Sequence, residues 1–216
     1  MIMKAKIIYF LVAMLLCTSG LYAQLGIKAG VNMANEIKSF NQADIAASFN
    51  SKNLTGYQIG LVYQAMPKKS GLGIEIGALL SQKGSTFHFD STSVSNNLKE
   101  GYKEINYLEV PFNVRYRISL GFLGIYGFGG IYGGYALSAK TVEEISNVVE
   151  TATFANVTDR IDYGYNFGAG IELFHKVQFG ATLSQGLKNI SIASTGLPTA
   201  ASSTNRVLSF NLVYLF

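Results

Sequence analysis

The sequence lacks several features that would indicate other classes of protein. It has no tryptophan, one cysteine, three prolines, two histidines and only 14% charged residues. Its single thiol, Cys17, lies in an apolar N-terminal stretch, so the rest of the chain has no disulfide, cysteine metal site or cysteine nucleophile. No stretch of this sequence reaches the roughly 20 apolar residues that a membrane-spanning helix needs. These absences leave a glycine- and tyrosine-rich chain with few charged residues to be explained.

The N-terminus has the composition of a secretory signal peptide. Two lysines precede the apolar run at 7–16, and Ala23 offers a cleavage site. We therefore expect residues 1–23 to be a signal peptide and residues 24–216 to form the mature domain; a buried N-terminal strand or helix is the alternative. Cleavage would leave 15 basic and 13 acidic residues, a balance that argues against nucleic acid as a partner.

What the chain does contain is alternation of apolar residues with polar or small ones, which predicts β-strands. In the tail, every second residue from Leu208 to Phe216 is bulky and apolar, and the alternation is cleanest in Ile161–Leu173. The fifth segment is apolar on both faces, so its pattern assigns no register. The pattern predicts eight strands: Leu25–Ala34, Thr55–Met66, Gly71–Lys83 with an extension toward Phe89, Ile105–Arg117, Phe122–Leu137, Ile161–Leu173, Val177–Lys188 and Thr204–Phe216.

The connections between these strands alternate between long and short. Long polar segments occupy 35–53, 90–101, 138–160 and 189–203, whereas only a few residues separate the other pairs. Outer-membrane barrels combine an even number of strands with short periplasmic turns and long external loops. The sequence therefore predicts an all-β fold, an eight-stranded antiparallel up-and-down transmembrane β-barrel in the cell outer membrane.

The two faces of the predicted strands differ sharply in charge. One face is apolar and uncharged, as lipid exposure requires, because a charge at mid-bilayer costs about 2–4 kcal/mol. A soluble sandwich or a lipocalin-like barrel would have the same two faces with the apolar one inside. The signal peptide, the aromatic tail and the loop asymmetry favour the membrane barrel. The opposite face carries Lys28, Glu75, Lys83, Glu109, Arg115, Arg117, Asp162, Glu172 and Lys188.

An eight-stranded barrel has an interior just wide enough for side chains to fill it. We therefore expect the nine charges to form a lumen charge network of ion pairs and amide hydrogen bonds; a narrow channel or small-ligand passage is the alternative. Outward aromatic residues near strand ends fit interfacial girdles or ordinary strand positions. These residues are Tyr57, Tyr63, Tyr116, Tyr163, Tyr214 and Phe216.

An enzyme would need a nucleophile with a base, or a carboxylate–histidine pair. His88, near Asp90 and Ser91, is the one candidate, and a solvated rim residue is the favoured interpretation. His175 falls in a predicted turn. We therefore expect no catalytic residues, no metal site and no cofactor.

The tail resembles the C-terminal signal read by the outer-membrane barrel insertion machinery. Ser209, Tyr214 and Phe216 fit that signal, and Asn211 stands where glycine is usual. The resemblance implies the barrel assembly machinery as a partner during insertion, with outer-membrane lipid around the folded chain.

Two segments resemble a known family. GLGIEIGALLSQKG (71–84) followed by YLEVPFNVRY (107–116) is similar to the paired motifs of the PorT-like outer-membrane β-barrel proteins common in Bacteroidota. The run YGYNFGAGIEL and the segment SQGLKNI (184–190) are also similar to that family. The resemblance covers essentially the whole mature chain and implies an eight-stranded barrel. It also implies a structural or accessory role that supports secretion or binds through external loops, and it supplies no catalytic residues.

Overall fold

The computed structural model describes residues 21–39, 49–67, 70–89, 100–143, 149–151, 160–188 and 202–216. Within these ranges no helix is long and apolar enough to cross a bilayer. The described residues form the strands β1 (Leu21–Ser39), β2 (Phe49–Pro67), β3 (Gly71–Phe89), β4 (Glu100–Leu120), β5 (Leu123–Glu143), β6 (Val149–Thr151), β7 (Ile161–Leu173), β8 (Val177–Gly186) and β9 (Ser202–Leu215).

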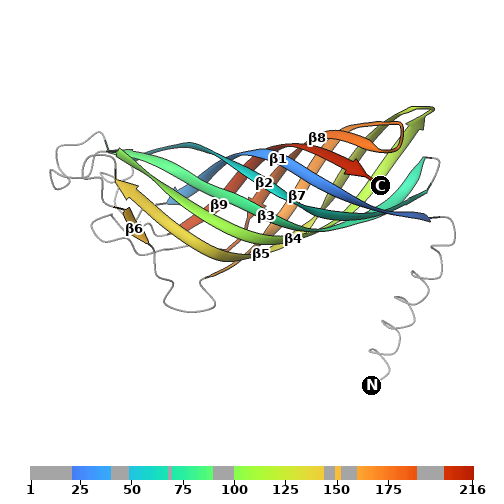
Figure 1. Ribbon diagram of the computed structural model, residues 1–216. Helices are drawn as coiled ribbons and strands as arrows, with labels where there is room; N and C mark the ends of the chain where they lie inside the picture. Colours follow the sequence, from blue (N-terminus) through green and yellow to red (C-terminus); the bar gives the residue numbers. More distant parts are fainter. Residues whose placement is uncertain are drawn as a thin grey trace, which may run out of the picture.

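Eight of these strands close into a barrel (Figure 1). Each pairs antiparallel with the next barrel strand in the chain, and β9 returns to pair with β1 from Gly26↔Leu215 to Ser39↔Ser202. The short strand β6 pairs only with the end of β5 and stands outside the cylinder. Closure satisfies the edge hydrogen bonds that an open sheet would leave exposed. The predicted eight-stranded antiparallel up-and-down barrel is confirmed.

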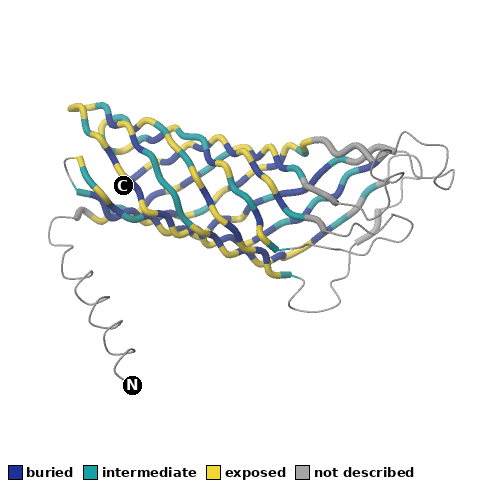
Figure 2. Tube along the Cα trace, turned by 180° about the vertical axis from the view of Figure 1, so that it is seen from behind, coloured by how far each residue is buried: buried dark blue, intermediate teal, exposed yellow. Residues whose placement is uncertain are grey.

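Exposed and buried residues alternate along each strand (Figure 2). In β9, for example, Leu208, Phe210 and Leu212 are exposed, whereas Ser209 and Asn211 between them are buried. Across the described residues, buried polar and charged side chains outnumber buried apolar ones, and large apolar side chains dominate the exposed set. A barrel that folds in water shows the reverse, so the outer surface of this barrel suits lipid.

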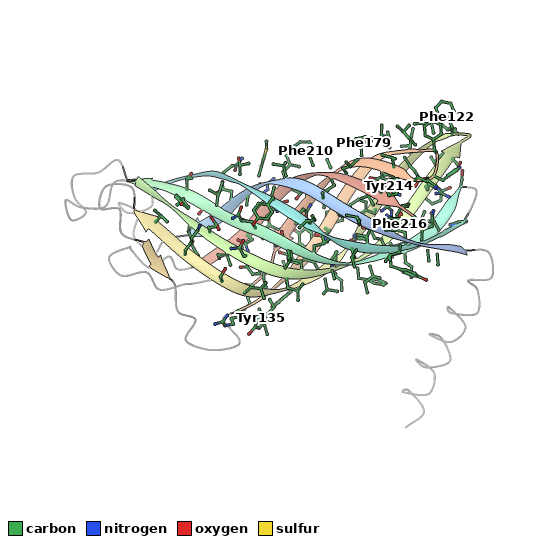
Figure 3. All side chains as sticks on the ribbon, in the orientation of Figure 1. Phe122, Tyr135, Phe179, Phe210, Tyr214 and Phe216 are labelled. Atoms are coloured by element: carbon green, nitrogen blue, oxygen red, sulfur yellow. The ribbon has the colours of Figure 1, made fainter. Side chains whose placement is uncertain are left out.

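The outward apolar rows have the height of a bilayer core. Those of β9 run from Leu208 to Phe216, roughly 26 Å along the strand at about 3.3 Å per residue. At a tilt of about 40° this is about 20 Å along the barrel axis, near the apolar band of about 25 Å in outer-membrane barrels. Figure 3 shows Phe122, Phe179 and Phe210 projecting away from the barrel wall.

The two ends of the barrel differ. At the turn end, short connections follow Leu120 and Leu173, and the Phe216 amide donates to the Leu25 carbonyl at 2.9 Å. At the loop end, β1, β2, β4 and β5 continue into segments predicted as loops, for example residues 35–39 and 138–143. These extensions lie beyond the apolar band. The strands remain paired there, but their sequences no longer alternate between apolar and polar residues. Patterns of apolar residues therefore underestimate strand length at this end.

The register of β5 shows why its pattern was ambiguous. Ile125 and Ile131 face outward and are exposed, whereas Tyr126 and Tyr132 point into the lumen and are buried. A bulge opposite Asn106 and Tyr107 of β4 shifts the register near the loop end. Bulky residues occupy both faces because the inward tyrosines pack against buried cations, as described below.

Candidate functional site

The interior of the barrel is filled by two groups of charged and polar side chains. The turn-side cluster consists of Gln64, Glu75, Arg115, Arg117, Glu172 and Gln178. The loop-side cluster consists of Lys83, Glu109, Tyr132, Asp162 and Asn205. Alternation along each strand directs these residues inward, and neighbouring strands of the closed sheet bring them together.

Glu75 is the first centre of the turn-side cluster. It forms an ion pair with Arg115 and accepts hydrogen bonds from Gln64 Nε2 at 2.7 Å and Asn113 Nδ2 at 3.1 Å. Arg115 Nη2 also donates to Gln178 Oε1 at 3.2 Å. A buried ion is costly unless it is both paired and hydrogen-bonded, and Glu75 meets both conditions.

Glu172 is the second centre of the same cluster. Arg117 Nη1 lies 2.7 Å from Glu172 Oε1, and Gln178 Nε2 donates to Glu172 Oε2 at 2.8 Å. His175, in the turn between β7 and β8, places Nδ1 3.1 Å from Glu172 Oε1. Arg117 also donates to the carbonyl of Pro67, so the cluster is hydrogen-bonded to the backbone at the end of β2.

The loop-side cluster surrounds Lys83. Its Nζ lies 2.9 Å from Glu109 Oε1 and 3.5 Å from Asp162 Oδ2. Tyr132 Oη and Asn205 Nδ2 donate to Asp162 Oδ2 at 3.2 and 3.0 Å. The Lys83 ammonium also lies 4.3 Å from the centre of the Tyr132 ring, within cation–π range.

Aromatic residues of β5 complete both clusters. The Arg115 guanidinium carbon lies 4.1 Å from the centre of the Tyr126 ring and 5.6 Å from that of Phe128. The sequence analysis assigned these rings to neither face. The sequence feature that could have indicated them is the excess of aromatic residues on a strand that has no polar face. Such an excess is expected when rings stack on buried cations.

Glycines of β5 make room for the charged side chains of its neighbours. Gly134 pairs with Glu109 of β4 and with Asp162 of β7, so both side chains flank a position without a Cβ. A Cβ at Gly124 would lie 3.4 Å from the Glu172 Cβ and 3.5 Å from the Arg117 Cδ. The glycine-rich strand therefore lets acids and bases two strands apart meet over it.

Amide and hydroxyl groups fill the middle of the lumen. Asn32 Nδ2 donates to the carbonyls of Tyr57 and Gln82 at 3.2 and 3.0 Å, next to the register shift between β2 and β3. Ser209 Oγ donates to Asn32 Oδ1 at 2.8 Å. Asn32 thereby satisfies carbonyl groups beside a bulge, where the ladder of strand hydrogen bonds is interrupted.

The nine predicted lumen charges fall into three groups. Seven belong to the two clusters, and Lys28 is buried at 6% exposure between Glu75 and Glu109. Lys188 lies two residues past the end of β8 and is only partly buried. The sequence analysis missed Lys103, which is 8% exposed, because its predicted strand began at Ile105.

The remaining candidates are placed as follows. The six aromatics proposed for girdles are all exposed on the outer surface. In the predicted insertion signal, Ser209 and Asn211 face the lumen, whereas Tyr214 and Phe216 face outward. The side chain of His88 lies outside the described residues. Among the described residues, no group of three or more His, Cys, Asp and Glu side chains could hold a metal ion.

These features define a class. A closed eight-stranded cylinder with an apolar exterior and a buried ionic interior is an outer-membrane β-barrel. The model of the outer membrane protein beta-barrel domain family matches residues 17–191, which is more than half of the chain. The protein belongs to this family and is an outer-membrane protein.

Three solved structures are similar to the chain at low sequence identity. OprG of Pseudomonas aeruginosa is 13% identical with a TM-score of 0.50, over 92% of this chain and 98% of that one. Ail of Yersinia pestis, in complex with the heparin analogue sucrose octasulfate, is 16% identical with a TM-score of 0.43, over 90% and 99%. Neisserial surface protein A is 8% identical with a TM-score of 0.44, over 90% and 99%. No curated protein sequence matches the chain. At these identities the likeness concerns the fold alone.

Proposed function

We propose that the protein is a closed, non-conducting barrel with a structural or accessory role in the outer membrane. The observation that carries this proposal is the filled lumen. Buried ion pairs at two levels link strands that are not neighbours, through Arg117–Glu172 of β4 and β7 at the turn end and Lys83–Asp162 of β3 and β7 nearer the loop end. A hydrated ion would have to break buried pairs at both levels, each of which costs several kcal/mol to disrupt.

Single-channel recording in planar lipid bilayers tests this proposal. The refolded protein is expected to give no stable openings, and a matched sample of a known open barrel shows that insertion is detectable. A Lys83→Ala/Asp162→Ala variant removes the loop-side bridge and should raise brief conductance at most, because the turn-side cluster remains. Long-lived openings of the wild type would instead support a narrow channel or small-ligand passage.

A barrel with a filled lumen can contact partners only through its outer surface. Two regions of that surface extend past the membrane-facing band. The loop-end extensions of β1 to β5 reach beyond the apolar band, and the short turns lie at the opposite end. We infer that the external end binds a partner or that the turn end serves an assembly. The resemblance to PorT-like proteins of Bacteroidota favours support of secretion. Comparing proteins in the culture medium of a deletion strain and a complemented strain tests that role.

The partners and the N-terminal processing belong to the same proposal. Outer-membrane lipid would surround the apolar band, and the barrel assembly machinery would insert the chain by reading its C-terminal strand. A signal peptide cleaved near Ala23 would trim the first three residues of β1, which begins at Leu21. N-terminal sequencing of the protein purified from outer membranes is expected to start at Gln24, and a start before residue 20 would contradict the processing.

A further inference from the structure

A small cavity lies in the lumen between the two clusters. About 20 Å³ of it is open to the centre of a water molecule. Its lining includes Lys28, Glu109, Asn113, Asn166 and Ser209. One water needs at least about 10–15 Å³ measured in this way, so the space suits one water and is too small for a hydrated ion.

Two amide oxygens of this lining have no hydrogen-bond partner among the described residues. They are Asn113 Oδ1 and Asn166 Oδ1, and both are buried. The orientation of the Asn113 amide is set by its partner, because Nδ2 donates to Glu75 Oε1 at 3.1 Å. A buried acceptor without a partner is unfavourable by about 1–3 kcal/mol, so both oxygens favour a donor in the cavity.

The strand register places the two asparagines on either side of one glycine. Gly130 of β5 pairs with Asn113 of β4 on one side and with Asn166 of β7 on the other. A Cβ at Gly130 would overlap the Phe112 carbonyl oxygen and would lie 2.5 Å from Asn113 Oδ1. Glycine at this position therefore lets the Asn113 oxygen keep its place beside β5.

Lys28 supplies the complementary group. Its side chain lines the same cavity, and no carboxylate of the described residues lies within ion-pair distance of its ammonium. Glu75 and Glu109 act on Lys28 only through longer-range attraction. A buried ammonium has three protons to donate, so this cavity combines a donor without a direct acceptor and two acceptors without a donor.

We propose that this cavity is a built binding site for one water molecule. The water accepts a hydrogen bond from the Lys28 ammonium and donates one to Asn113 Oδ1 and one to Asn166 Oδ1. A halide ion could not donate to the two oxygens, and a metal cation would be repelled by Lys28. Through Asn113 the water connects Lys28 to Glu75, and Lys28 thereby joins the turn-side cluster.

A high-resolution crystal structure of the full protein in detergent, with and without sodium bromide, tests the site. The expected result is one solvent peak within about 2.7–3.2 Å of both oxygens and of Lys28 Nζ, without anomalous bromide signal. An empty cavity, a Lys28 Nζ bonded directly to either oxygen, or a bromide peak would each overturn the proposal.

A double-mutant cycle gives a second, independent readout. Lys28→Met and Asn166→Leu are measured singly and together by urea unfolding in lipid vesicles. A bridging water makes the effects non-additive, with a coupling of about threefold or more in the unfolding equilibrium constant. The control pair is Lys28→Met with Asn106→Leu, because Asn106 bonds to Ser138 away from the cavity, and these effects should add. Additive effects for Lys28 and Asn166 would count against the bridge.

Discussion

Removing one partner of the buried Arg115–Glu75 pair should strongly destabilise the barrel. The two side chains are 3% and 2% exposed, and Arg115→Met leaves the Glu75 carboxylate buried without its ion pair. Breaking a buried pair by deleting one partner costs about 3–5 kcal/mol. The Arg115→Met variant also lacks the hydrogen bond to Gln178 and the stacking on Tyr126. We therefore expect a loss of unfolding free energy at the upper end of this range.

The double variant Arg115→Met/Glu75→Gln separates charge from packing. Glutamine keeps one oxygen that can accept from the Gln64 amide or from the Asn113 amide, and it removes the unpaired charge. The double variant should therefore recover about 2 kcal/mol or more relative to Arg115→Met alone.

Unfolding in urea, followed in lipid vesicles, measures both variants. The folded fraction is read from gels, because a folded barrel migrates faster than the boiled chain. A loss of less than about 1 kcal/mol of unfolding free energy for Arg115→Met would refute this prediction. So would a double variant that is as unstable as the single one. Either result would mean that water reaches Glu75 and replaces the arginine.

Three further predictions concern other parts of the barrel. Asn32→Leu should cost about 2–3 kcal/mol in urea unfolding, because it leaves carbonyls beside the β2–β3 register shift without donors. A loss below about 0.5 kcal/mol, the size of a typical surface substitution, would mean that the bulge does not depend on these hydrogen bonds. Leu212→Arg, near the middle of the exposed row of β9, should lower the free energy of unfolding by about 2–4 kcal/mol. Leu208→Arg, near the loop end, should lower it by only about 0–1 kcal/mol. Equal losses would mean that the bilayer centre does not lie at Leu212. Phe216→Asp should lower the amount of barrel assembled in cells several-fold while refolding in detergent stays near wild type; unchanged assembly would argue against the C-terminal signal.

Local alternation, taken with the loop asymmetry, the predicted signal peptide and the aromatic tail, was enough to predict the architecture. The strand Ile161–Leu173 was predicted with the bounds that the structure has, because a large apolar residue alternates there with a small or polar one throughout the span of the membrane. The same rule separated lipid-facing residues from lumen-facing charges on most strands. A side chain's face depends only on its parity along the strand, which the sequence contains directly.

The partnerships inside the barrel depended on the closed sheet. Glu109 and Asp162 are 53 positions apart in the chain, and they flank Gly134 only because β5 lies between β4 and β7. The inward direction of Tyr126, the bulges, and the strand extensions past the apolar band also follow from pairing between strands. Sequence by itself determined the face of most strand residues outside β5, because parity along a strand is a local property. Tertiary structure decided which buried charges meet, because register and closure bring together residues that no local pattern connects.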